Sequence, residues 1–166
     1  MKEQTLILTL EMEAARQQFF SDQRDKFFPK HCNYLHAHIT LFHKLPDDLK
    51  IENIIQQFTD RRPIELEITS IKNIGNGVAY VIQSNELQEL HGAMQKAFAE
   101  WLIPQDKNKL WPHITIQNKV TAFKAKETAE LLVQDFKPFV VQAIGISSWL
   151  YLGGPWEKKA TYLFQK

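Results

Sequence analysis

The tripeptide His-Ile-Thr occurs twice in this chain, 75 residues apart. Each copy lies in an apolar run of the kind that forms a strand, where side chains two positions apart point to the same side. Each copy therefore directs one imidazole and one hydroxyl to the same side of its strand. Two such strands facing each other would supply a pocket with acid–base groups suited to a phosphate ester, with no metal required. We predict a catalytic set made of His38, Thr40, His113 and Thr115.

The chemistry of a phosphate ester explains why these residue types are paired. In-line displacement requires one group to take a proton from the attacking oxygen and another to protonate the leaving oxygen, and each role is typically worth about 10²–10⁴ in rate. A histidine titrates close enough to neutral pH to serve as either group. Threonine hydroxyls can donate hydrogen bonds to the non-bridging oxygens, where charge accumulates. Positive charge at the rim and aromatic stacking on a base give four candidate substrate-binding residues: Lys44, Lys119, Phe42 and Trp111.

The similarity between the two halves extends beyond the tripeptide. At the same offset, Asn33 matches Asn108 and Pro63 matches Pro138, and no insertion or deletion is needed. Internal repeats of this kind indicate duplicated structural units. We therefore predict a single bilobal domain over residues 1–166, with pseudo-repeat lobes at approximately 1–76 and 77–166.

Local patterns predict strand, helix, strand, helix, strand, twice over, followed by one more strand. This order is typical of an α+β protein, here with two antiparallel-rich sheets, helices on their outer faces and a central cleft. The motif strands are expected over residues 36–43 and 111–119. Strict alternation along the first would put Phe42 and Lys44 beside His38 and turn His43 to the opposite face.

A metal site on the histidines of the first motif strand is a weaker interpretation. His36 and His38 share a face, but alternation turns His43 away from them, and zinc would need a further ligand. Neither His36 nor His43 has a histidine at the equivalent position of the second half, so both are interpreted as peripheral. We expect neither a metal nor another cofactor.

Bulk properties limit the partners. The net charge of +1 over 166 residues argues against a protein that binds long nucleic acid through its phosphates, but allows a small nucleotide or an RNA end. Cys32 is the only cysteine, as in proteins of a reducing compartment. The short apolar run at residues 6–10 is flanked by acidic residues, unlike a signal peptide, and no stretch is apolar enough to span a membrane. We expect a cytoplasmic monomer.

Two His-x-Thr motifs in a bilobal repeat resemble the two-histidine (2H) phosphoesterase superfamily, which includes 2′-5′ RNA ligase-like proteins and RNA 2′,3′-cyclic phosphodiesterases. The run Pro-His-Ile-Thr-Ile at residues 112–116 is especially similar to the second motif of that family. The resemblance covers nearly the whole chain. It implies that His38 and His113 are the catalytic pair, that Thr40 and Thr115 orient the phosphate, and that the reaction opens a 2′,3′-cyclic phosphate to a 2′-phosphate.

The chain departs from that pattern twice. Many members carry Leu-Gly just after the first motif, where this chain reads Lys44-Leu45-Pro46, and many carry an arginine after the second, where it reads Asn118-Lys119. Two alternatives therefore stay open. One is 2′-5′ RNA ligase activity, and the other is a nucleotide- or RNA-end-binding module that has lost turnover. The intact histidines and threonines argue against the second, since a binding module needs only hydrogen-bond donors.

Overall fold

A computed structural model describes residues 4–166, so the first three residues of the predicted first lobe lie outside the described residues. The observed elements follow the predicted order, and each half also contains one short 3₁₀ turn. Their bounds are β1 Thr5–Met12, α1 Ala14–Phe27, η1 Lys30–Cys32, β2 Ile39–Pro46, α2 Leu49–Phe58, β3 Ile64–Asn73, β4 Val78–Gln83, α3 Asn85–Ala97, η2 Pro104–Lys107, β5 His113–Gln117, α4 Ala122–Gln134, β6 Phe139–Tyr151 and β7 Trp156–Leu163.

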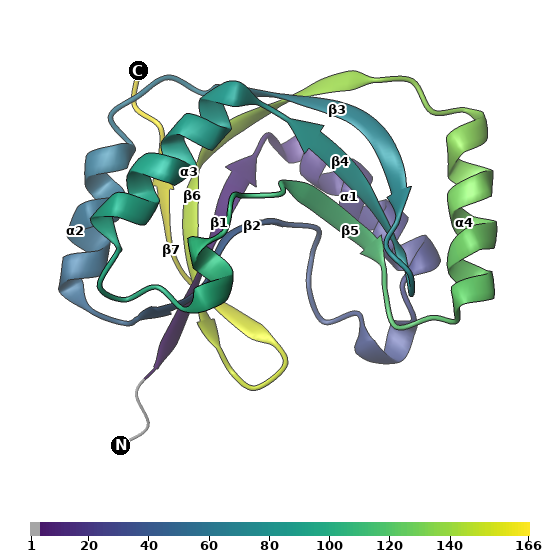
Figure 1. Ribbon diagram of the computed structural model, residues 1–166, viewed down its shortest axis with the longest axis horizontal. Coiled ribbons are helices and arrows are strands. Elements are labelled where there is room, and N and C mark those ends of the chain that lie inside the picture. The colour runs from purple at the N-terminus through teal and green to yellow at the C-terminus, as the bar shows by residue number, and fades with distance from the viewer. Residues whose placement is uncertain (1–3) are drawn as a thin grey trace.

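The seven strands form one antiparallel sheet. The 13-residue strand β6 pairs with β3 through its first part, residues 139–143, and with β7 and β1 through its second part. Strands β1, β2 and β7 therefore lie beside one part of β6, and β3, β4 and β5 beside the other (Figure 1). The predicted α+β class is confirmed, while the two predicted sheets are joined into one because β6 belongs to both.

The two halves of the chain exchange helices. Helix α1 follows β1 in the chain but contacts β5, and α4 contacts β3 and β4. Helix α3 contacts α2, and Nε2 of His91 in α3 lies 3.0 Å from the main-chain oxygen of Leu41 in β2. Helices α2 and α4 lie at opposite ends of the molecule (Figure 1). Each half thus supplies a helix that supports a motif strand of the other half.

Three helices begin at a side chain that accepts a main-chain N–H, as is usual for helix N-termini. Asp48 accepts from Lys50 before α2, and Ser84 and Thr121 do the same before α3 and α4. One cluster of buried apolar side chains, drawn from both halves, forms the core. Within residues 4–166, no helix has the length and apolar character needed to cross a membrane.

Candidate active site

His38 and His113 are held by equivalent hydrogen bonds. Nδ1 of His38 lies 2.9 Å from the main-chain oxygen of His36, and Nδ1 of His113 lies 2.7 Å from that of Trp111. Because a carbonyl oxygen can only accept, the proton of each neutral ring is on Nδ1, and Nε2 keeps its lone pair. His38 directly precedes β2 and His113 is the first residue of β5. Both rings therefore offer an unprotonated Nε2 from equivalent positions in the two halves.

Each of these imidazoles also packs against an indole. The ring of Trp111 stacks on His113 with 4.2 Å between centroids, and the ring of Trp156 lies against His38 at 4.7 Å. Such contacts limit the rotation of an imidazole beyond what one hydrogen bond achieves. Trp111 remains 42% exposed, so part of its face is available to a ligand, and its contact with a substrate stays a prediction.

Two hollows border the imidazoles. The larger, of about 250 Å³, is lined by His113 together with Thr40 and Trp111. The smaller, of about 140 Å³, is lined by His38. Thr40 belongs to the first motif and His113 to the second, so the larger hollow brings residues of both motifs together.

Burial controls the charge of both imidazoles. Desolvation lowers the pKa of His38 to about 4; the hydrogen bond to the His36 carbonyl opposes the shift, and the positive charges of Arg24, His113 and His43 add to it. Desolvation also lowers the pKa of His113 from its ordinary value, again opposed by a carbonyl and reinforced by His43. The imidazoles of His38 and His113 are therefore neutral at pH 7 and lie within electrostatic reach of each other.

A β-bulge after Thr40 corrects the predicted faces of Phe42 and His43. A second irregularity in β2 follows between Phe42 and Leu45. Thr40 pairs with Thr9, whereas Phe42 pairs with the adjacent Leu8, so one extra residue lies in β2. The extra residue reverses the alternation, and His43 lines the larger hollow instead of pointing away from it. The prediction that His43 faces away from the cleft is therefore wrong. Within residues 4–166, no three His, Cys, Asp or Glu side chains are grouped to hold a metal ion.

The same bulge removes Phe42 from the site. Its side chain is 0% exposed, stacks on the ring of His91 at 4.7 Å and meets Phe98 edge-on. The predicted contact between Phe42 and a substrate is therefore wrong. An equivalent bulge follows Thr115 in β5 and buries Gln117, which donates a hydrogen bond of 2.8 Å to Thr128.

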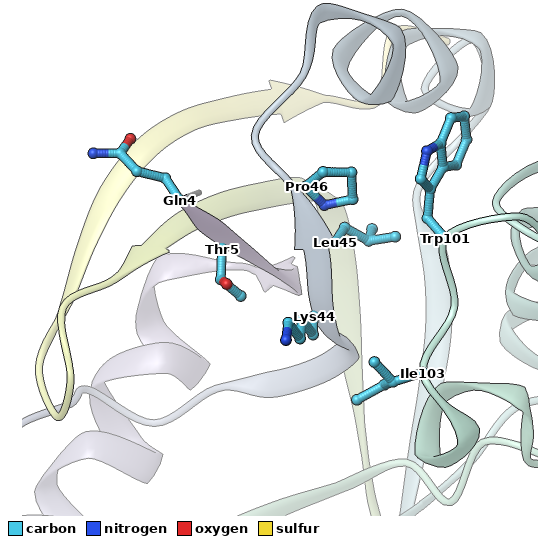
Figure 2. A pocket seen from close by; sticks show the side chains of 7 residues that line it. All are labelled: Gln4, Thr5, Lys44, Leu45, Pro46, Trp101 and Ile103. Carbon is cyan, nitrogen blue, oxygen red and sulfur yellow. The ribbon is translucent and has the colours of Figure 1, made fainter. Parts of the chain in front are cut away.

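The two candidate lysines do not line the larger hollow. Lys44 lines a separate pocket of about 290 Å³ with Trp101 and Ile103, as Figure 2 shows. Lys119 is exposed in the turn after β5, where its φ of 60° lies in the left-handed region. Thr115 is half-buried beside His113, and its main-chain oxygen accepts a hydrogen bond from Arg24. Contacts of these three side chains with a substrate stay predictions.

Two buried charged residues of the site were missed by the sequence analysis. Arg24 in α1 donates to the main chain of β5, and Asp106 in η2 binds the ring of His43. Each lies more than 60 residues from its partner in the chain, so no local pattern marks it. The only signal in the sequence was that both are charged residues, and charged residues are common on protein surfaces.

Solved structures with the same fold define the structural class. The chain aligns with the crystal structure of TT0787 of Thermus thermophilus at a TM-score of 0.67 and 13% identity, covering 96% of this chain and 97% of that one. It aligns with the crystal structure of E. coli LigT complexed with 3′-AMP at a TM-score of 0.63 and 13% identity, covering 99% and 100%. The crystal structure of a phosphoesterase aligns at a TM-score of 0.61 and 12% identity, covering 99% of this chain and 100% of that one. This is a LigT-like fold.

Sequence comparison gives the family. The family model of the 2′-5′ RNA ligase superfamily matches residues 10–155. The chain therefore belongs to this superfamily, one of the two-histidine (2H) phosphoesterase group. No curated protein sequence matches the chain.

Proposed function

We propose that this protein is a metal-independent phosphodiesterase that opens 2′,3′-cyclic phosphates of nucleotides or RNA ends to 2′-phosphates. The observation that carries the proposal is the matched pair of imidazoles, each with Nδ1 held by the carbonyl two residues earlier and Nε2 free. A general base and a general acid are the two groups that hydrolysis of a cyclic phosphodiester requires. Membership in a superfamily of ligases and phosphoesterases supports the same reaction class.

We assign the role of general base to His38, because its lowered pKa leaves it unprotonated at neutral pH. Its pKa of about 4 keeps Nε2 unprotonated across the neutral range. In the proposed step, Nε2 of His38 takes a proton from water as the water oxygen bonds to phosphorus. The P–O3′ bond breaks, and the departing O3′ receives a proton from Nε2 of His113. The net change is the addition of one water molecule, which gives a 2′-phosphate and a free 3′-hydroxyl.

His113 must carry a proton before it can act as the acid. Its pKa is lowered in the free protein, but a bound phosphate brings negative charge to the imidazole and favours its protonated form. Thr40 lines the same hollow as His113, which supports the proposal that its hydroxyl donates to a non-bridging phosphate oxygen. In this scheme the phosphate of the bound substrate keeps His113 in the protonated form that it needs to act as the acid.

The substrate class follows from the chemistry and from the fold. LigT has been crystallised with 3′-AMP, ATP and NADP+, which are small nucleotides. We extend this to a small nucleotide or RNA end carrying a cyclic phosphate, acted on by a monomer. The exposed face of Trp111 beside His113 provides an aromatic surface on which a base can stack.

The test is hydrolysis of adenosine 2′,3′-cyclic phosphate in excess EDTA. The products are separated by chromatography against 2′-AMP and 3′-AMP standards. We expect 2′-AMP alone, at a rate unchanged by the chelator. Loss of activity in EDTA or formation of 3′-AMP would overturn the proposed mechanism, and tight binding without turnover would identify a binding module instead.

A further inference from the structure

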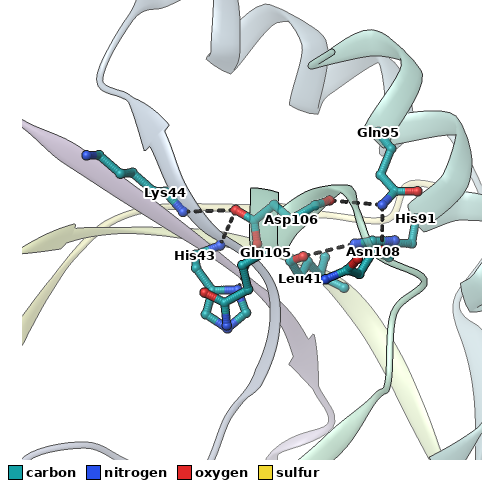
Figure 3. A network of polar contacts seen from close by, with 8 residues as sticks. All are labelled: Leu41, His43, Lys44, His91, Gln95, Gln105, Asp106 and Asn108. Carbon is teal, nitrogen blue, oxygen red and sulfur yellow. Dashed lines mark hydrogen bonds and ion pairs between the residues drawn. The ribbon is translucent and has the colours of Figure 1, made fainter. Parts of the chain in front are cut away.

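The pair formed by His43 and Asp106 has no role in the reaction described above. Nδ1 of His43 lies 2.8 Å from Oδ1 of Asp106, and the main-chain N–H groups of His43 and Lys44 donate to Oδ2 at 2.8 and 3.1 Å (Figure 3). The Asp106 side chain is 1% exposed, whereas that of His43 is 47% exposed. A buried carboxylate thus holds an exposed imidazole.

These bonds fix which nitrogen of His43 faces the larger hollow. The carboxylate accepts the Nδ1 proton, so Nε2 is directed away from Asp106. The contact to Nε2 is with the side-chain amide of Gln105, at 3.5 Å, which is long for a hydrogen bond. Nε2 is therefore free to exchange this weak partner for a ligand.

A purely structural role does not account for the whole arrangement. The two main-chain N–H groups bound by Oδ2 already tie η2 to β2, and the main-chain oxygen of Asp106 accepts a further bond from Gln95. Attachment of η2 needs no imidazole. The additional bond to Nδ1 orients a side chain toward a hollow that His113 also lines.

The lining of the larger hollow suits an anion. Lys109, Gln105 and Asn108 provide a charge and amide donors around His43 and His113. Asp106 is the only acidic residue among the lining residues, and its oxygens are bonded to His43 and Lys44. The volume of about 250 Å³ exceeds what one phosphate fills but is below the range of about 300–1,000 Å³ for complete drug-sized ligands.

We propose that the part of this hollow beside His43 is a subsite for a second phosphate of the substrate, next to the phosphate that His113 acts on. There the second phosphate is bound by Lys109 and by the protonated ring of His43, in which Asp106 accepts the Nδ1 proton and Nε2–H donates to a phosphate oxygen. Asp106 is the positioning residue of this subsite. The inference rests on the proposed function and narrows its substrate class to cyclic phosphates that carry another phosphate. That second group is either a terminal 5′-phosphate or the next internucleotide phosphate, and the chemistry of recognition is the same for both.

The experiment compares kcat/KM for three substrates: adenosine 2′,3′-cyclic phosphate, its 5′-phosphorylated form, and the dinucleotide ApA ending in a 2′,3′-cyclic phosphate. We expect one of the two doubly phosphorylated substrates to be preferred by about 10-fold or more, as for a charge-assisted contact. Preference for the 5′-phosphorylated mononucleotide identifies a terminal phosphate, and preference for the dinucleotide identifies an internal one. No preference for either overturns the subsite.

The variants H43A and K109A test the residues. Each variant is expected to reduce the preference for the doubly phosphorylated substrate. In H43A the ratio of the kcat/KM values should fall to near unity. The matched control is K107A. It removes the same charge two positions earlier in the chain, at a residue that lines a different cavity, and its preference should equal that of the wild type. An equal loss of kcat/KM on all three substrates in H43A would contradict a second-phosphate site.

Asp106 is tested with D106N, which retains size but weakens the hold on Nδ1. Reduced preference together with a retained melting temperature supports positioning, whereas a lower melting temperature with unchanged preference would show a structural role only. Equilibrium competition with 3′-AMP and adenosine 3′,5′-bisphosphate separates this inference from the proposed function. If no cyclic substrate is hydrolysed, the proposed function fails. The subsite is still supported in that case if the bisphosphate binds more tightly than 3′-AMP and if H43A abolishes this difference in affinity. Equal affinity for both nucleotides would reject it.

Discussion

Arg24 and Thr115, 91 residues apart, are joined by a hydrogen bond of 2.9 Å from Nη1 to the main-chain oxygen. The same guanidinium donates through Nε to Asn33 at 3.2 Å and lies over the ring of Phe28. Burial lowers the pKa of Arg24 to about 10, so the group remains charged at neutral pH. Through this residue, helix α1 of the first half fixes the motif strand of the second.

Replacement of Arg24 should therefore weaken both the fold and the site. In R24M, the main-chain oxygen of Thr115 loses a buried donor, which costs about 1–3 kcal/mol of unfolding free energy. The measurement is the urea midpoint, with R62M, at an exposed arginine, as the control. A midpoint of R24M equal to that of R62M would show that Arg24 does not stabilise β5.

Removal of either imidazole should abolish most of the hydrolysis. We expect H38A and H113A each to lower kcat on adenosine 2′,3′-cyclic phosphate by about 10²–10⁴-fold. The double variant should be little slower than either single variant, because the two groups act in one step. H31A, at an exposed histidine in η1, is the control. Turnover near the wild-type rate in either single variant, with the circular dichroism spectrum retained, removes that residue from the mechanism.

The pH dependence of kcat/KM follows from the pKa directions in the free protein. The base is lost when His38 is protonated, so activity falls as pH decreases through about 4. The acid is lost when His113 is deprotonated, and because its pKa is lowered from 6.5, activity falls as pH rises before 6.5 is reached. We expect a bell-shaped profile with an acidic optimum, measured under first-order conditions. A plateau extending above pH 7 would contradict the assignment.

The same two histidines should make stability decrease in acid. Their folded-state pKa values lie below the ordinary value of 6.5, so the unfolded chain binds more protons as pH falls from 6.5 toward 4. Each such histidine can contribute at most about 1.4 kcal/mol per pH unit of lost unfolding free energy. Urea denaturation at pH 7, 6 and 5 should show that the unfolding free energy declines with pH, and that this decline is smaller in H38A than in the wild type. An identical decline in both proteins would show that His38 has no lowered pKa.

Two glycines provide opposite tests of packing. A Cβ at Gly77 would lie 1.9 Å from the main-chain oxygen of Gln117, so G77A should displace β5 from β4 and cost about 2 kcal/mol or more. At Gly92, inside α3, a Cβ would meet no atom of another element within 4 Å, so G92A should stabilise the protein by up to about 1 kcal/mol. Guanidinium denaturation measures both. Equal stability of the two variants would contradict the close approach at Gly77.

The order of the elements could be predicted from sequence because it depends on local patterns that occur twice. The long strand predicted at residues 139–152, in the second half of the chain, is confirmed as β6, Phe139–Tyr151. Its role in joining both groups of strands could not be predicted, because pairing partners are set by tertiary contacts. The tripeptides themselves were visible because each histidine and its threonine are only two residues apart.

For a related reason, the sequence did not predict to which face of the sheet the side chains after each His-Ile-Thr tripeptide point. Strict alternation placed Phe42 beside His38, but the bulge depends on how β2 pairs with β1. One extra residue moves the side chains that follow it, as far as the next irregularity, to the other face of a strand. His43 consequently changed from a peripheral residue to a lining residue, and its partner Asp106 is 63 positions away in the chain.

The unbroken course of β6 has a consequence for how this protein takes up a ligand. Ladder hydrogen bonds run from one group of strands to the other through this single strand, so the strands that carry the two motifs belong to one sheet. An extra residue lies in β6 between Ala143 and Gly145, at the junction of the two groups. In the proposed reaction, a ligand would therefore meet two histidines whose relative positions are set through one shared strand.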